Sequence, residues 1–130
     1  MSHVAKYDLG LTGAVSKDLM AIAMAAVAAT NKGKVVVGKD ANVKDTYGNP
    51  TKVEASISTP GLPLGVGVDF TPSGPKWVTD SWGKKNQVDS LTAQIKQAYI
   101  SLAVTTAAKR MGFNSKVKMN NAILSIELEK

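Results

Sequence analysis

Apolar and polar positions change period several times along the chain, and each period predicts a different kind of element. Between residues 53 and 58, Val53, Ala55 and Ile57 alternate with Glu54 and serines. A period of two is typical of a strand with one solvent-facing side. Short segments rich in β-branched residues predict further strands, at residues 3–12, 34–40, 64–70 and 76–82 and as a closing hairpin over 113–130 that turns at Asn120–Asn121.

Two longer segments repeat their apolar residues at helical spacing. The first follows Ser16, a favourable N-cap, and is expected to end at Asn31 and Gly33. Its predicted buried stripe is Leu19, Ile22, Ala23, Ala26 and Val27. The second is expected to begin at Asp89 or Ser90 and to end at Gly112. Its predicted stripe is Leu91, Ile95, Ala98, Tyr99, Leu102, Thr106 and Ala107.

The order of these elements is β-α-β-β-β-β-α-β-β, and each helix has one apolar stripe to bury. This order predicts an α+β fold, with an antiparallel or mixed sheet, two helices packed on one face and a split β-α-β-like topology. We expect a single domain over residues 1–130. Gly65 and Gly67 fall on one face of the strand at 64–70, where we expect a helix to pack closely over them.

Composition excludes several classes of chemistry. The chain is 44% hydrophobic and 20% charged, as in an ordinary globular protein, and it contains no cysteine and one histidine, His3. Disulfides, thiolate nucleophiles and cysteine metal sites are therefore excluded, and a zinc site would need more histidines. We expect no cofactor and no metal. The apolar segment at 19–29 is too short to span a bilayer, and we therefore expect a cytoplasmic location.

The formal charge of +6 comes almost entirely from lysine, because fifteen of the sixteen basic residues are lysine and only Arg110 is arginine. Lysine offers a hydrated point charge and lacks the planar fork with which arginine recognises phosphates and guanines. The charge therefore indicates either a solvated basic surface or weak, sequence-independent attraction to nucleic acid.

No segment carries a convincing catalytic pattern. The Ser16–Lys17 pair is explained by a helix cap, and the glycines of "GLPLGVG" lead into a strand instead of a phosphate-binding helix. Asp69 and Asp80 could converge from neighbouring strands as an acid pair, but ion pairs with Lys76, Lys84 or Lys85 are the favoured explanation. We therefore expect a protein that is not an enzyme.

The stretch "PKWVTDSWGKKN", residues 75–86, holds both tryptophans of the chain. Trp77 and Trp82 have opposite parity in a strand, so they face opposite sides unless a bulge brings both into the core. We predict that Trp77 is buried, and that Trp82 is exposed at the strand end. Asp80, Lys84 and Lys85 would complete a contact surface around Trp82, with Asp80 in its polar rim.

Several segments together resemble a known family. They are the start "MSH", the Gly-Asn turn before an alternating strand, "LPLGVGVDF", "WVTDSWG", "KQAYISLA" and "RMGF". The chain is similar to the uncharacterised family of hypothetical chloroplast reading frame thirty-five, found in cyanobacteria and plastids and more widely in bacteria. It departs from the family at Ser81 and over residues 35–45. The resemblance implies a fold, a photosynthetic or phage-related context and, if the gene is plastid-encoded, a location in the stroma. It implies no reaction.

The sequence thus predicts a small non-enzymatic binding or accessory protein. We expect it to act through a protein partner or by self-association, at an open sheet face or an edge strand. One alternative is a weak, sequence-independent nucleic-acid-binding protein. The other is a small-ligand-binding domain, with a pocket between the sheet and the alanine-rich first helix.

Overall fold

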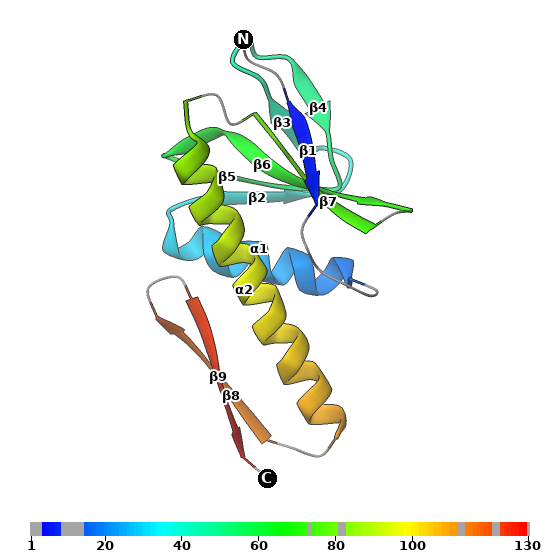
Figure 1. The fold of residues 1–130 in the computed structure, drawn as a ribbon, viewed down its shortest axis with the longest axis vertical. Helices are drawn as coiled ribbons and strands as arrows, with labels where there is room; N and C mark the ends of the chain where they lie inside the picture. The colour runs from blue at the N-terminus through cyan, green and yellow to red at the C-terminus, as the bar shows by residue number, and fades with distance from the viewer. Residues whose placement is uncertain are drawn as a thin grey trace.

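A five-stranded antiparallel sheet lies at the centre of the protein. The computed structural model describes residues 4–8, 15–72, 74–80, 83–111, 114–120 and 123–129. The order of strands across the sheet is β1 (Ala5–Asp8), β7 (Gly74–Thr79), β6 (Leu62–Thr71), β5 (Ala55–Thr59) and β2 (Lys34–Val37). Helices α1 (Lys17–Thr30) and α2 (Lys85–Arg110) pack on one face (Figure 1). The predicted α+β class, with both helices on one face, is confirmed.

The first strand, the first helix and the second strand form the predicted split β-α-β unit. Every neighbouring pair in the sheet is antiparallel, so β1 and β2, separated by three strands, run in the same direction. α1 crosses beneath the sheet from one edge to the other, which Figure 1 shows. Both ends of this unit are therefore edge strands.

Helix α1 has the predicted ends, and its buried face includes Ala23 and Val27 of the predicted stripe but differs from it elsewhere. Its N-cap is Ser16, whose hydroxyl accepts a hydrogen bond from the Leu19 N–H at 3.2 Å. The buried residues are Met20, Ala23, Met24, Val27 and Ala28. Ile22, placed in the predicted stripe, is 52% exposed. The prediction was wrong because this helix is apolar on nearly all sides, so the pattern does not select a face, and two flexible methionines fill the interior.

Helix α2 begins at Lys85, four to five residues before the predicted cap at Asp89 or Ser90. The added turn buries Val88, and Lys84 at the N-cap makes no side-chain cap hydrogen bond. Tertiary burial therefore extends the helix past the local capping signal. Of its predicted core positions, Leu91, Ile95, Ala98 and Tyr99 are buried, and Leu102 and Thr106 are partly buried. Ala107 was placed wrongly: it is exposed, and the last turns bury Thr105 and Ala108 instead. The predicted terminator Gly112 lies outside the described residues.

The second face of the sheet is partly covered by a hairpin that the sequence did not predict. This hairpin consists of β3 (Asn42–Lys44) and β4 (Pro50–Lys52). Its neighbourhood forms a small core from Ala41, Val43, Val53 and Val78. Ser56, expected on a solvent-facing side of its strand, is only 8% exposed. The expected open face is therefore partly closed.

Gly67 allows this hairpin to approach the sheet. A Cβ at Gly67 would lie 2.7 Å from a methyl carbon of Val53 and 2.9 Å from one of Val43. The side chains that pack closely against Gly67 are therefore those of Val43 and Val53, on the hairpin side of the sheet. A helix was predicted at this place, and that prediction was wrong. A glycine in mid-strand is explained by this close approach.

The chain ends in a second hairpin, β8 (Asn114–Asn120) and β9 (Ile123–Glu129), which contacts α2 (Figure 1). Asn120, predicted as the first turn residue, belongs to β8 and pairs with Ile123, and Asn121 lies outside the described residues. Neither described helix is long and apolar enough to cross a membrane.

Candidate functional site: a cleft lined by amide side chains

Of the predicted cluster around the two tryptophans, the structure describes Trp77, Asp80, Lys84 and Lys85. Trp77 is 6% exposed and belongs to the helix-side core, as predicted. Asp80 is 4% exposed, so it does not stand in an accessible rim. Trp82 lies outside the described residues. The predicted contact surface around Trp82 therefore stays a prediction.

The two lysines of the predicted surface, Lys84 and Lys85, are exposed where α2 begins. Lys85 is bonded to Asp89, one helical turn later, at 2.7 Å. The hydrogen bond that Lys85 donates to Asp89, together with the negative charge of Asp89, raises the pKa of Lys85 above its ordinary value. This pair is typical of a solvated helix surface and adds little to stability.

The other residues considered as candidate catalytic groups make structural contacts. Asp69 pairs with Lys6 at 3.1 Å, which was not among the lysines proposed for it. Ser16 caps α1, and its backbone N–H donates to the Tyr99 hydroxyl at 3.0 Å, so this serine joins the two helices. Within the described part of the chain, no three His, Cys, Asp or Glu side chains gather as a metal site would require.

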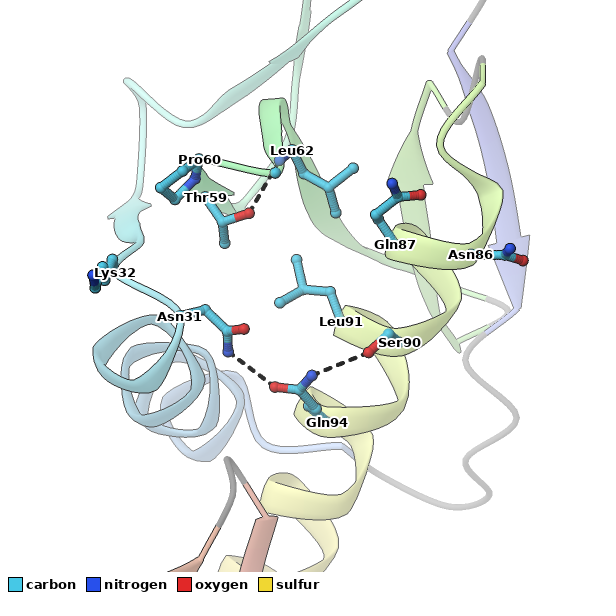
Figure 2. Close-up of a pocket in the computed structure, with 11 residues that line it drawn as sticks. Asn31, Lys32, Thr59, Pro60, Leu62, Asn86, Gln87, Ser90, Leu91 and Gln94 are labelled. Atoms are coloured by element: carbon cyan, nitrogen blue, oxygen red, sulfur yellow. Dashed lines mark hydrogen bonds between the residues drawn. The ribbon is translucent and has the colours of Figure 1, made fainter.

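A cleft of about 520 Å³ opens where the end of α1, the turn between β5 and β6 and the first turns of α2 meet (Figure 2). Its apolar floor is formed by Leu62 and Leu91, whose side chains point into the space between the three segments. The remaining lining is Asn31, Lys32, Thr59, Pro60, Gly61, Asn86, Gln87, Ser90 and Gln94. The volume is in the range of small-molecule sites, but the wall is unusually rich in amides.

A chain of hydrogen bonds fixes one wall of the cleft. The Asn31 amide N–H₂ donates to Oε1 of Gln94 at 2.9 Å, across 63 residues of sequence. The same group donates to the carbonyl oxygen of Val27 at 2.8 Å. Gln94 in turn donates from Nε2 to the Ser90 hydroxyl at 3.2 Å. Because the Asn31 nitrogen donates to two acceptors and the Gln94 amide is bonded through both its oxygen and its nitrogen, the wall presents a defined orientation toward the cleft (Figure 2).

Other polar groups at the cleft remain available to a ligand. Gln87 is exposed and makes no hydrogen bond to another described residue through its side chain. In Figure 2 the Gln87 amide lies over the cleft near Leu62, whereas the Asn86 side chain points away from it. Thr59 accepts a hydrogen bond from the Leu62 N–H at 3.1 Å, which orders the turn opposite Gln94.

Lys32, at the edge of the cleft, has an unusual backbone. Its φ of 56° places it in the left-handed region, where glycine is the usual residue after a helix. The next residue, Gly33, donates from its N–H to the Ala28 carbonyl at 2.8 Å, which closes the end of α1. A Cβ on Gly33 would lie 2.6 Å from the Ser58 carbonyl oxygen. Glycine is therefore required at position 33, although position 32 is the one with the left-handed backbone. Strained residues of this kind are enriched at functional sites.

The electrostatic character of the cleft follows from its lining. None of the described residues that line it is acidic, and its single charged side chain is Lys32. Amides and hydroxyls both donate and accept hydrogen bonds. The arrangement can therefore recognise a neutral polar molecule, and the lysine at its edge can attract a negative substituent. Among the described lining residues, no hydrogen bond joins a nucleophile to a base, and the contacts present are those of a binding site.

None of the cleft residues was predicted from the sequence to form a site, although a small-ligand pocket between the sheet and the first helix was one of the alternatives. A signal was present: Gln87, Ser90 and Gln94 recur at spacings of three and four and so share one helix face. It was missed because the helix was expected to begin only at Asp89 or Ser90. Comparison of the chain with models of protein families, with curated proteins and with solved structures finds no match, so the resemblance to the chloroplast reading-frame family stays a hypothesis.

Proposed function

We propose that this chain is a non-enzymatic binding protein and that its ligand, a small polar molecule with a neutral hydrogen-bonding ring, occupies the amide cleft. The observation that carries the proposal is the hydrogen bond between Asn31 and Gln94, supported by Ser90 beside it. This network orients polar groups above an apolar floor before any ligand arrives. Preorganisation of this kind lowers the entropic cost of binding.

The class of ligand follows from the groups that line the cleft. Leu62 and Leu91 offer an apolar surface against which one face of a ring can lie. The surrounding amides match groups that donate and accept side by side, as in a nucleobase edge or an N-acetylated sugar. A strongly cationic ligand is disfavoured, because no acidic side chain among the described lining residues would balance its charge.

Lys32 supports a refinement of the ligand class. A lysine in a left-handed conformation costs roughly 1 kcal/mol relative to glycine. Its charge stands at the edge of the cleft, where an outward-pointing phosphate or carboxylate of a bound ligand would lie. We expect the charged form of a ligand to bind more tightly than its neutral parent.

The proposal is tested by titrating the ¹⁵N-labelled protein with four probes: adenosine, adenosine 5′-monophosphate, N-acetylglucosamine and, as a negative control, putrescine. We expect at least one of the first three to shift the side-chain amide signals of Gln87 and Gln94 at millimolar concentration. Adenosine 5′-monophosphate should bind several-fold more tightly than adenosine, and Lys32→Gly should abolish that difference. Putrescine should leave the same signals unchanged.

Two glutamine substitutions in α2 provide the matched comparison. Gln87→Ala should weaken binding by about tenfold, because it removes a ligand contact. Gln97→Ala should have no effect, because Gln97 is exposed and is not among the residues that line the cleft. Neither exposed residue supports the core, so stability should be unchanged in both variants. Equal binding by the two variants, or no shift at the cleft amides with any probe, would overturn the proposal.

A further inference from the structure

Strand β2 forms one edge of the sheet and offers its backbone to another chain. Among the strands that the structure describes, β2 has a neighbour on one side only, namely β5. Edge strands with free backbone groups readily pair with a further strand, and proteins use this as a mode of recognition. The question is which groups β2 presents and what they would accept.

The register identifies the outward-facing groups. Gly38, which follows β2, donates its N–H inward to the Glu54 carbonyl at 3.0 Å. In an antiparallel pair, successive residues direct their N–H and C=O groups alternately toward and away from the neighbour. Val36 and Lys34 therefore point their backbone groups at β5, whereas Val35 and Val37 point theirs outward. Two residues thus present N–H and C=O groups at the edge.

The side chains of β2 are also accessible. Val36 is 42% exposed and Val37 is 59% exposed, although both are apolar residues of a strand. They lie on opposite faces of the sheet, because side chains alternate along a strand. Val36 borders a hollow of about 210 Å³ on the hairpin side of the sheet. An added strand would cover apolar surface on both faces.

Charge selects the partner. Between residues 32 and 40 the chain carries three lysines, at 32, 34 and 39, against the single acid Asp40. No described carboxylate forms an ion pair with any of these lysines at the distances found for the pairs elsewhere in the protein. Pairing with a second copy would bring these lysines together in two chains that each carry +6. Like charges opposite one another disfavour self-association.

We propose that β2 binds an acidic, extended segment of a partner protein by antiparallel strand addition. The partner residue opposite Lys34 would share its face of the sheet and would be acidic. Residues opposite Val35 and Val37 would share the helix-side face and would be apolar. The partner segment would therefore alternate acidic and apolar residues. This surface is separate from the amide cleft and does not depend on the function proposed there.

Synthetic peptides test the proposal directly. The probe is a fluorescein-labelled peptide of sequence EVEVEVE, measured by fluorescence anisotropy against the full chain, and the matched control is KVKVKVK. We expect only the glutamate peptide to bind, with an affinity that falls as salt is raised. In the antiparallel register the valine N–H groups point at β2. Methylation of the valine nitrogens should abolish binding, and methylation of the glutamate nitrogens should not.

Two substitutions in β2 locate the binding surface. Val37→Pro removes one outward N–H and leaves the bonds to β5 in place, so it should weaken binding of EVEVEVE by about tenfold. Lys34→Glu, which leaves the backbone intact, should weaken EVEVEVE and create binding of KVKVKVK. Circular dichroism confirms that each variant is folded. If Val37→Pro does not fold, Lys34→Glu decides the matter alone.

Three outcomes would overturn the proposal. Equal affinity for the valine-methylated and unmethylated peptides would show that backbone pairing is absent. Binding of EVEVEVE that is unchanged by Lys34→Glu would place the peptide elsewhere. A concentration-dependent dimer of the free chain that Val37→Pro dissociates would show that β2 pairs with a second copy instead.

Discussion

The two helices contact one another in two different ways. Near their middle they share an apolar interior, to which α1 contributes Met20 and Met24 and α2 contributes Ile95 and Tyr99. At the end of α1 they meet through amides that border an open cleft. The interior is stabilised by removal of apolar surface from water, whereas the amide contact exchanges one set of hydrogen bonds for another. Stability should therefore reside in the first contact, and binding in the second.

The largest expected effect concerns the apolar contact. Ile95 is fully buried, so Ile95→Ala should lower the free energy of unfolding by about 2–5 kcal/mol. Leu102 is half-buried at the border of the same cluster, so Leu102→Ala should cost clearly less. Urea denaturation followed by circular dichroism measures both. An equal, small effect at the two sites would contradict the placement of α2 over the core.

The second effect extends the comparison to the opposite face of the sheet. Gly67→Ala would push a methyl group against Val43 and Val53, and should lower the free energy of unfolding by about 1–3 kcal/mol. Gly61→Ala is the control, since its added Cβ would meet only the Thr59 hydroxyl oxygen, at 3.9 Å. If Gly67→Ala is as stable as Gly61→Ala in the same urea experiment, the hairpin does not pack against the sheet as described.

The amide contact should give a smaller effect. Asn31→Ala removes hydrogen bonds to Gln94 and to the Val27 carbonyl, and should cost about 1 kcal/mol. A double-mutant cycle with Gln94→Ala isolates the bond between the two side chains. We expect a coupling of about 0.5–1.5 kcal/mol. A coupling energy as large as the loss of unfolding free energy in Ile95→Ala would mean that the amides hold the two helices together. The case for a ligand site would then be weaker.

The smallest effect should be a gain. Lys32→Gly relieves the left-handed backbone and should raise the free energy of unfolding by about 0.5–1 kcal/mol, although added freedom of the unfolded chain offsets part of this. Lys32→Asn, which also tolerates this conformation, should gain less. Thermal unfolding of the unsubstituted protein and of the two variants gives the order of their stabilities. A loss of stability on Lys32→Gly would mean that the lysine side chain has a structural role.

Local signals in the sequence were sufficient to predict most of the central sheet and the first helix. Alternation around Ile57, the cap at Ser16 and the long apolar stripe through Ile95 each depend on residues close in sequence. The first turn of α2 was missed because it is specified by the burial of Val88 and not by a cap. The β3–β4 hairpin was missed because its strands span three residues each, too short for a period to show.

The cleft could not be derived in the same way. Asn31 and Gln94 are ordinary polar residues in the sequence, and only the packing of α1 on α2 brings them together. The polar spacing of Gln87, Ser90 and Gln94 indicates a helix face but not what lies opposite it. The predicted surface around Trp82 shows a second limit. The position of Trp77 inside its strand predicted its burial correctly, but Asp80, predicted to lie in an accessible rim, is buried.

The most direct test of the ligand site is a measurement of nuclear Overhauser effects between a bound probe and the protein. The probe is whichever of adenosine 5′-monophosphate or N-acetylglucosamine shifts the amide signals, and the protein carries labelled leucine and valine methyl groups. Our account predicts contacts from the ring protons of the probe to the methyl groups of Leu62 and Leu91. Contacts to Val36 or Val37 instead, or a complete lack of contacts to the two leucines at saturation, would contradict it.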